Sequence, residues 1–261
     1  MSKPFGRNPD LIECIENHRS VRNFTNEKIS DDDLRRILSA TQSASSSSHG
    51  QAYSIINVAS MEKRLKIAEY AGNQVHVAEC SHFFIYCADL YRVDSIAQQS
   101  GVKGVDMQTS MDSTEMFIVA TVDAALAAQT TAIAAEALGY GIVYTGGIRN
   151  KIEEVSKLLK LPQRVYPVFG MCIGVPDQAA IPDKKPRLPL EAMFFEDEYP
   201  PFEAVYEYIK QYDQTMKEHY EARTTGKRIN TTWSEVMVEK RSKPRRLNIK
   251  SYLTNQGFPL K

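Results

Sequence analysis

The chain has 261 residues, of which 43% are hydrophobic and 25% charged, the composition of an ordinary globular protein with a sizeable core. Its 32 basic residues balance its 32 acidic residues, which argues against a surface built as a whole for nucleic acid or an acidic membrane. The four cysteines show no metal-ligand spacing, and the first residues form no apolar signal segment. We therefore expect a cytoplasmic protein with reduced thiols, and neither a nucleic-acid nor a membrane partner.

Helical and strand patterns alternate through the first 175 residues. Helices are expected after Asn8-Pro9-Asp10, after Ser30, and over 61–71, 113–138 and 151–160; strands are expected over 52–58, 82–88, 141–145 and 165–175. In the first helix, Leu11, Ile12 and Ile15 should form the apolar stripe, with Cys14 facing the core. The alternation by itself favours one α/β domain.

The longest helical pattern, over 113–138, is dense in alanine and ends at Gly139, a residue typical of a helix C-terminus. Small side chains allow neighbouring elements to approach closely on several sides. We expect this helix to be central and buried, and to contribute to a subunit interface.

The character of the chain changes after Val175, where prolines divide a loop-rich segment. A polar helix over 202–223 and shorter helical pieces around 233–239 and 247–256 complete the sequence. The expected organisation is a core over 1–175 followed by a helical extension over 176–261, which forms either an appendage or a small second lobe.

Three polar segments are candidates for binding an anion. His18-Arg19-Ser20-Val21-Arg22 places three potential cations and a hydroxyl within five residues, Lys184-Lys185-Pro186-Arg187 is a second basic cluster, and residues 43–48 are rich in serine. Charge-assisted hydrogen bonds of about 1.5–3 kcal/mol each would suit a phosphate monoester. Each segment alone also fits a solvated surface turn. Their combination is what predicts a site.

The glycine pattern excludes a dinucleotide fingerprint. Gly139-Tyr140-Gly141 leaves a helix and enters a strand, whereas that fingerprint lies between a strand and the following helix. Gly146-Gly147 follows a strand, so its backbone N–H groups could approach a flat ligand, although a plain turn explains it equally well. The sequence holds no nucleophile elbow and no histidine spacing typical of zinc, and we expect no metal site.

Basic residues are also enriched near the end of the chain. The loop from Arg223 to Arg228, before Trp233, is either solvated surface or a mobile loop that grasps an anion. Arg241, Lys243, Arg245 and Arg246 raise the alternative of a nucleic-acid partner. The neutral overall charge and the lack of interleaved aromatic residues argue against it.

Taken together, these segments resemble the nitroreductase superfamily, and within it the NADPH-dependent, FMN-containing group of flavin reductases and oxygen-insensitive nitroreductases. The resemblance covers nearly the whole chain. It is carried by residues 18–25, 45–52, 71–74, 144–150, 185–189 and 232–234.

The resemblance implies an α+β fold, in which helices surround a mixed, mainly antiparallel sheet and a helical C-terminal extension follows. It implies an intertwined homodimer with two FMN sites at the interface. The implied activity is ping-pong, two-electron reduction of nitroaromatics, quinones or free flavins by NADPH. Because FMN carries the hard chemistry, no side-chain acid or base is expected to be indispensable.

The resemblance also assigns residues. His18, Arg19, Ser20, Lys185 and Arg187 would hold the FMN phosphate. Arg22 would lie at the flavin pyrimidine edge and stabilise negative charge there. Ribityl or ring atoms would be bonded by Ser46, Ser47 and Gln74, and the isoalloxazine would be lined by Tyr144, Thr145, Gly146 and Gly147. Arg223 and Arg228 would bind the 2′-phosphate of NADPH.

One departure from the family pattern concerns the electron acceptor. His49-Gly50 follows the serines where many relatives carry bulkier apolar or aromatic residues, so the preferred acceptor stays open. Two other functions also stay open: a flavin reductase that supplies reduced FMN to a partner, and a flavin-binding protein with negligible turnover.

Overall fold

The computed structural model describes residues 11–101 and 105–261. The chain forms two compact units. The first comprises the chain up to Ala179 together with Arg246–Lys261, and the second is Ala180–Arg245. By packing, residues 246–261 therefore belong with the core, because Tyr252 and Leu253 of α11 (Ile249–Asn255) are buried there.

The first unit is built on a four-stranded sheet with the order β1-β2-β4-β3. The strands are β1 (Tyr53–Asn57), β2 (His82–Asp89), β3 (Gly141–Thr145) and β4 (Val165–Gly174). Every neighbouring pair is antiparallel, so the expectation of an α+β fold is confirmed and the α/β organisation suggested by simple alternation is wrong. Within the described part of the chain, the mixed character is limited to one parallel bridge, between Ser20 and Ile142.

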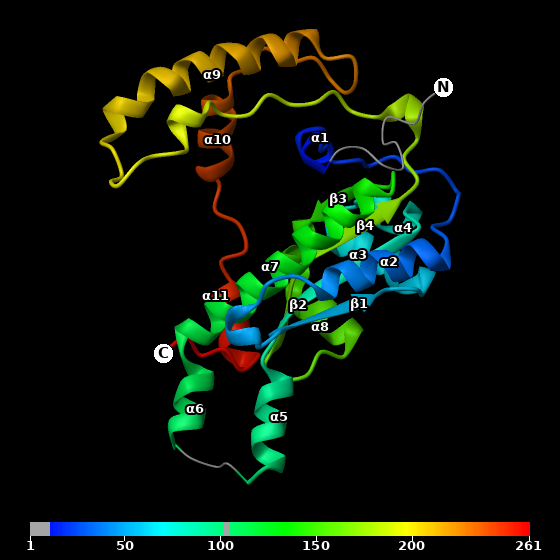
Figure 1. Cartoon of the computed structure of the whole chain (residues 1–261), viewed down its shortest axis with the longest axis vertical. Coiled ribbons are helices and arrows are strands. Elements are labelled where there is room, and N and C mark those ends of the chain that lie inside the picture. Colours follow the sequence, from blue (N-terminus) through cyan, green and yellow to red (C-terminus); the bar gives the residue numbers. More distant parts are fainter. Residues whose placement is uncertain (1–10, 102–104) are drawn as a thin grey trace. The chain divides into compact units, whose positions relative to one another are not determined.

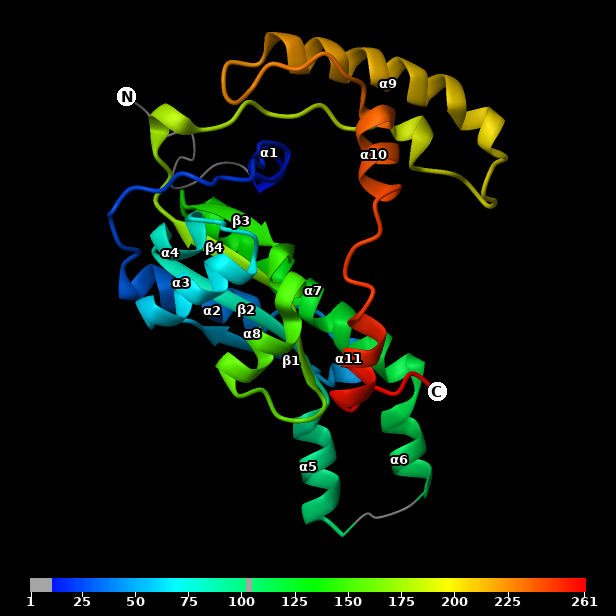
Figure 2. The same ribbon diagram turned by 180° about the vertical axis from the view of Figure 1, so that it is seen from behind.

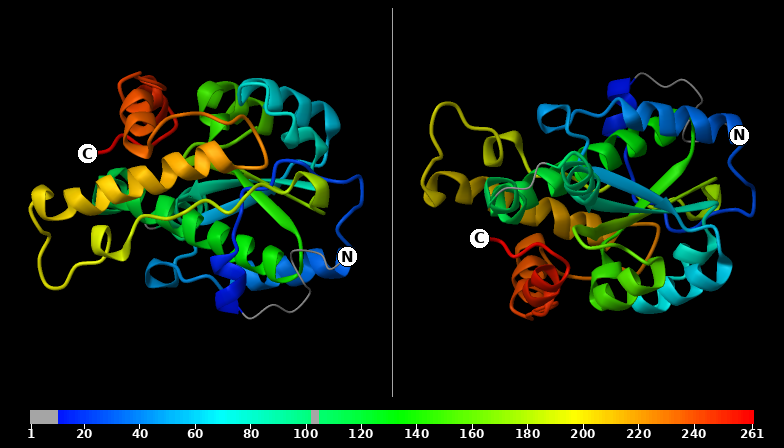
Figure 3. Two further views of the ribbon diagram at one scale, coloured as in Figure 1. Left: turned by 90° about the horizontal axis from the view of Figure 1, so that it is seen from above. Right: turned by 90° about the horizontal axis from the view of Figure 1, so that it is seen from below.

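Helices cover both faces of this sheet, because the buried side chains of its strands alternate between two cores. In β2, Phe83 and Ile85 face one cluster, while Phe84 and Tyr86 face the other. The first face is covered by α3 (Met61–Tyr70), α4 (His76–Glu79) and α8 (Ile152–Leu159); the second by α2 (Asp31–Gln42) and α7 (Thr114–Ala137). Opposite views show the two layers (Figures 1 and 2), and the views along the vertical axis show the sheet between them (Figure 3).

Helix α7 is the long alanine-rich helix, and one side of it is buried as expected: Ala120, Ala124, Ala127 and Ala128 are fully inaccessible. Its other side is not buried in a single chain, since Ile118, Val122 and Leu126 are 48%, 48% and 41% exposed. Among the described helices, α7 alone is long and apolar enough to cross a membrane by length and composition. It packs instead against α2 and the sheet as a core helix.

The apolar stripe of the first helix is exposed within one chain. In α1 (Leu11–Glu16), Leu11, Ile12 and Ile15 are exposed, and only Cys14 faces the core. The expected start of this helix at residues 8–10 lies outside the described residues. All four cysteines are buried, and none is joined in a disulfide.

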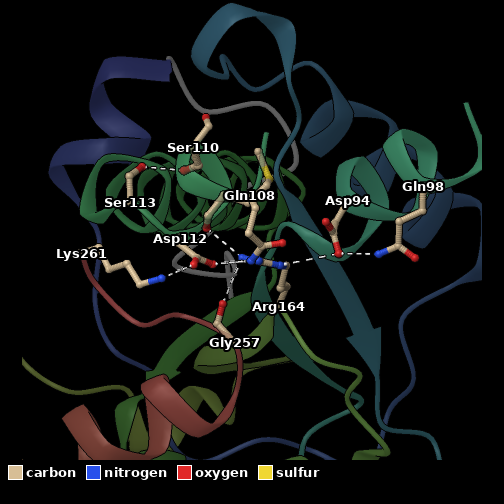
Figure 4. A network of polar contacts seen from close by, with 10 residues as sticks. Asp94, Gln98, Gln108, Ser110, Asp112, Ser113, Arg164, Gly257 and Lys261 are labelled. Carbon is tan, nitrogen blue, oxygen red and sulfur yellow. Dashed lines mark hydrogen bonds and ion pairs between the residues drawn. The ribbon is translucent and has the colours of Figure 1, made fainter. Parts of the chain in front are cut away.

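Three helices were not predicted: the short α4, α5 (Tyr91–Gln99) and α6 (Val105–Asp112). Helices α5 and α6 lie side by side in both opposite views (Figures 1 and 2). The buried Arg164 holds their bases (Figure 4). Its guanidinium donates to Asp112 Oδ1 at 2.9 Å and to the Gly257 carbonyl at 3.1 Å, and pairs with Asp94 at 3.6 Å. Lys261 Nζ lies 2.7 Å from the other oxygen of Asp112.

The second unit consists of α9 (Phe202–Ala222), α10 (Trp233–Arg241) and the segments around them. Tyr212 and Tyr220 of α9 are buried in a small cluster, against which Trp233 of α10 packs. Thr232 and Glu235 form a reciprocal capping box that begins α10. Short 3-10 helices also occur between the longer elements of both units: η1 (Ser47–His49), η2 (Gly146–Lys151), η3 (Gln178–Ala180) and η4 (Leu190–Ala192).

Candidate functional site

The basic segment after α1 runs alongside the start of β3. Ser20 forms a parallel bridge with Ile142, and the Val21 amide donates to the Ile142 carbonyl at 2.9 Å. Val21 is buried, and a Cβ on Gly141 would lie 2.8 Å from the Val21 Cβ, so this close approach requires glycine. Because the alignment is parallel, Arg22 lies level with the second half of β3.

The cationic side chains of this segment differ in their surroundings. Arg22 is exposed, and its guanidinium makes a long contact of 3.3 Å to the Ser20 carbonyl. Arg19 donates to the Asn17 carbonyl at 3.1 Å. His18 is held more firmly, because its Nδ1 lies 2.7 Å from the buried carboxylate of Glu136. The segment thus presents two arginine forks and one fixed imidazole.

The end of β3 opens into the glycine turn of η2, which packs on the turn after α3. A Cβ on Gly147 would lie 2.4 Å from the Ala71 carbonyl oxygen and 2.6 Å from Gln74 Nε2, so only glycine fits there. Gln74 donates to that same carbonyl at 3.0 Å. The hydroxyl of half-buried Tyr144 donates to Gln129 at 3.2 Å. The predicted residues Gln74, Tyr144, Thr145, Gly146 and Gly147 therefore gather at the end of β3.

A histidine that sequence reasoning missed lies beside this cluster. His76 is 7% exposed and begins α4, two residues after Gln74. Burial and the nearby Arg22 guanidinium lower the pKa of His76, so its ring is neutral near pH 7. Its Nε2 is buried and has no hydrogen-bond partner among the described residues. A buried nitrogen of this kind is costly unless a ligand satisfies it.

The predicted serines lie elsewhere. The Ser47 amide donates to Oδ1 of buried Asp123 at 3.0 Å, so the serine loop is anchored to α7 at that residue, whereas His18 is anchored at Glu136. Positions 123 and 136 are thirteen residues apart, about 20 Å along a helix. Figure 1 shows α1 near one end of α7 and the loop after α2 near the other. Within one chain, Ser46 and Ser47 are not brought to the His18 cluster.

In the second unit, a polar contact relates two of the remaining predicted residues, Lys185 and Arg223. Asp183 accepts hydrogen bonds from the Thr224 amide at 2.6 Å and the Thr224 hydroxyl at 2.7 Å, and these bonds hold its pKa below the usual range. This contact fixes the loop that begins at Arg223 beside the segment containing Lys185. Both of these cations lower the pKa of His219, after the larger effect of burial. Arg187 and Arg228 are exposed.

Sequence reasoning also missed both anchoring acids of α7. Asp123 is 1% and Glu136 2% exposed, and each fixes a segment that the resemblance assigned to ligand binding. A weak signal existed, since both interrupt an alanine-rich stretch. An acid on an apolar helix must find a partner when it is buried.

The donor set at the end of β3 fits a flavin mononucleotide. Two arginines, an imidazole and a hydroxyl suit a phosphate, while the glycine turn and the unsatisfied His76 nitrogen suit a flat ring with polar edges. Among residues 11–101 and 105–261, no three histidine, cysteine or acidic side chains group to hold a metal ion.

Comparisons with known proteins agree with this chemistry. The family model "Nitroreductase family" matches residues 15–175, and "Nitroreductase family, C-terminal domain" matches residues 185–261. A Bacillus subtilis protein named FMN reductase (NADPH) is 41% identical, over 95% of this chain and 98% of its own. The structure of NfrA1 nitroreductase from B. subtilis matches with a TM-score of 0.89 and 40% identity, over 95% of this chain and 99% of that one.

A Vibrio harveyi structure shows the same likeness. It is titled NADPH:FMN oxidoreductase complexed with NAD+, and it matches with a TM-score of 0.83 and 37% identity. The match covers 95% of this chain and 97% of that one.

Proposed function

This chain belongs to the nitroreductase family along nearly its whole length, and we propose that it is an NADPH-dependent FMN oxidoreductase. It takes a hydride from NADPH and passes two electrons to an oxidised acceptor in a ping-pong cycle. Nitroaromatics, quinones and free flavins are the proposed acceptors, and the cytoplasm is the proposed compartment. The relatives named FMN reductase (NADPH) and NADPH:FMN oxidoreductase support this function.

The observation that carries the proposal is the meeting of cations and glycines at one end of the sheet. The basic segment 18–22 lies along β3, and β3 ends in the Gly146-Gly147 turn beside Gln74. A phosphate-bearing ligand with a flat ring would use both features at once.

The phosphate is proposed to lie against His18, Arg19 and Ser20. The family resemblance assigns Lys185 and Arg187 to the same phosphate. Charge-assisted hydrogen bonds to a phosphate are roughly twice as strong as neutral ones. The arginine forks supply planar donors, and His18 supplies a donor of fixed direction because Glu136 holds its ring.

FMN, when bound, supplies the hydride acceptance and donation that no side chain can supply. Arg22 is proposed to lie at the pyrimidine edge, where a fixed cation stabilises negative charge. Its proximity to His76 supports this role, since the free Nε2 of that ring could bond the same polar edge. Tyr144, Thr145 and the amides of the glycine turn would line the ring.

The preference for NADPH is proposed to come from Arg223 and Arg228, because arginine forks suit the 2′-phosphate. The guanidinium carbon of Arg223 lies 5.5 Å from the centroid of the Tyr220 ring, so this ring supports one face of the arginine fork. The acceptor face is expected to include His49-Gly50 in place of bulkier residues.

The site is proposed to be shared between two copies of the chain in a homodimer. The separation of Ser47 from His18 along α7 supports this, because the partner subunit's Ser46 and Ser47 can complete a site that the same chain's serines do not reach. The exposed apolar rows Ile118-Val122-Leu126 and Leu11-Ile12-Ile15 supply surface for such an interface.

The test of the function is the absorption spectrum of the purified protein without oxygen. A bound flavin should give a yellow protein, and NADPH should bleach it within seconds, with a quinone restoring the colour. A colourless protein that binds no added FMN would overturn the proposal. A yellow protein with negligible NADPH oxidation would instead make it a flavin-binding protein.

A mixing experiment tests the shared site. One variant carries Arg19→Ala with Arg22→Ala, and the other carries Ser46→Ala with Ser47→Ala. Refolding them together should restore FMN binding in about a quarter of sites, because each hybrid dimer holds one intact site. A mixture no better than either variant alone would contradict the shared site.

A further inference from the structure

A buried carboxylate lies directly behind His18. Glu136 is 2% exposed, in the last turn of α7, and its Oε1 is 2.7 Å from His18 Nδ1. We propose that Glu136 is a positioning residue that turns His18 into a charged donor for a phosphate monoester, and thereby makes the site select FMN over flavins without a phosphate. This inference rests on the proposed function, in which His18 contacts the phosphate.

Hydrogen-bond chemistry determines the protons on His18. A carboxylate only accepts hydrogen bonds, so Nδ1 carries a proton and donates to Glu136. In a neutral ring, Nε2 would then be an acceptor and would face the phosphate oxygens, which are acceptors too. Contact with the phosphate therefore requires a proton on both nitrogens. The charge of such a ring is compensated by the carboxylate behind it, as in other carboxylate–histidine pairs.

The groups around Glu136 leave this charge to His18. The Cys14 thiol from α1 and the Tyr144 hydroxyl from β3 both lie within range of the charge on Glu136. Burial first, and the negative charge of Glu136 second, raise the pKa of both groups, so both stay neutral at physiological pH. Neither competes with the imidazole as a charge partner.

The placement on α7 also fixes direction. Glu136 stands on a long helix packed against α1, α2 and the sheet, whereas Arg19 and Arg22 lie on the loop after α1. A ligand of any anionic kind can attract the two arginines. His18 offers one donor of fixed direction. Loss of its positive charge should therefore weaken the binding only of ligands that bear the phosphate.

The test measures the dissociation constants of two flavins, FMN and riboflavin, for the Glu136→Gln variant. Glutamine keeps the side-chain size and can still accept from Nδ1–H, but it carries no charge. The dissociation constant for FMN should rise about tenfold, while that for riboflavin, which lacks the phosphate, should change less than about twofold. Glu115→Gln, an exposed acid on the same helix, is the control and should leave both constants unchanged.

Two further measurements separate this role from a general loss of packing. His18→Gln should lose the same preference for FMN, and adding Glu136→Gln to it should cause no further loss. In wild-type protein bound to FMN, ¹⁵N NMR of labelled histidine should show protons on both ring nitrogens of His18. A ring with a single proton would overturn the proposal even if Glu136→Gln fails to fold.

The outcomes also distinguish this inference from the proposed function. If wild-type protein prefers FMN and Glu136→Gln keeps the whole preference, the role of Glu136 is wrong while the function stands. If wild-type protein binds FMN no better than riboflavin, the phosphate cradle itself is wrong, and the role of Glu136 falls with it.

Discussion

Replacing Asp123 with asparagine should release the serine loop. Asp123 accepts from the Ser47 amide at 3.0 Å and from the Ala52 amide at 2.9 Å, so one carboxylate closes both ends of the loop. Inside it, three residues other than glycine adopt left-handed backbone angles: Ser48, His49 and Gln51, with φ of 49°, 55° and 48°. Each costs about 1–2 kcal/mol. Two bonds to a buried carboxylate, about 1.5–3 kcal/mol each, hold the loop against this cost.

In Asp123→Asn the side chain keeps its size but offers one acceptor, and its NH2 group then faces a backbone donor. The loss of one bond and the opposed donors should destabilise the protein by about 2–3 kcal/mol. In a chain of this length, this lowers Tm by roughly 5–10 °C. If the freed loop holds its bound conformation a tenth of the time, the apparent Kd for FMN rises about tenfold.

The assay is thermal unfolding of the flavin-free protein, followed by titration with FMN. Glu115→Gln removes one charge from the exposed surface of the same helix and should shift Tm by less than about 2 °C. An Asp123→Asn protein that matches this control in both Tm and FMN affinity would refute the anchoring role.

Three other predictions follow from the remaining polar groups. Arg22→Ala should slow reduction of the bound flavin by NADPH with little change in Tm; an unchanged rate in stopped flow with unchanged FMN affinity would contradict its role. Arg223→Ala with Arg228→Ala should raise KM for NADPH and spare NADH, whereas equal effects on both would exclude a 2′-phosphate contact. Burial works to raise the pKa of Asp112, but bonds from Lys261 and Arg164 outweigh it and lower that pKa. Stability should therefore fall as pH drops below about 4, and less steeply in Asp112→Asn, as urea unfolding would measure.

Local signals in the sequence were sufficient for most of the core. The N-cap predicted at Ser30 is present, with its hydroxyl accepting from the Asp33 amide at 3.1 Å. The apolar run 82–88 forms the buried strand β2. The helix end predicted at Gly139 lies two residues beyond Ala137, the last residue of α7. These features depend on neighbours within a few residues, which is what periodicity and capping report.

Features that depend on distant partners were not predictable in this way. The apolar stripe of α1 looks like a core face, yet within one chain Ile12 is 63% exposed while Cys14 is buried. Alternating helices and strands suggested parallel pairing, whereas the register of β2 with β4 is antiparallel. Helices α5 and α6 were not predicted, because they are held by hydrogen bonds and ion pairs from Arg164, a residue more than fifty positions away in the sequence.

The proposed division of the candidate site between two copies rests on the geometry of one helix. Helix α7 has 24 residues and is therefore about 36 Å long. Its two buried acids lie thirteen residues, or about 20 Å, apart and hold two of the segments proposed to bind the ligand: Glu136 holds His18, and Asp123 holds the loop of Ser47. A rigid helix cannot shorten to bring these segments together around one small molecule. Both segments can serve the same ligand only if a second chain, related by a two-fold axis, presents its Asp123 end to this chain's Glu136 end.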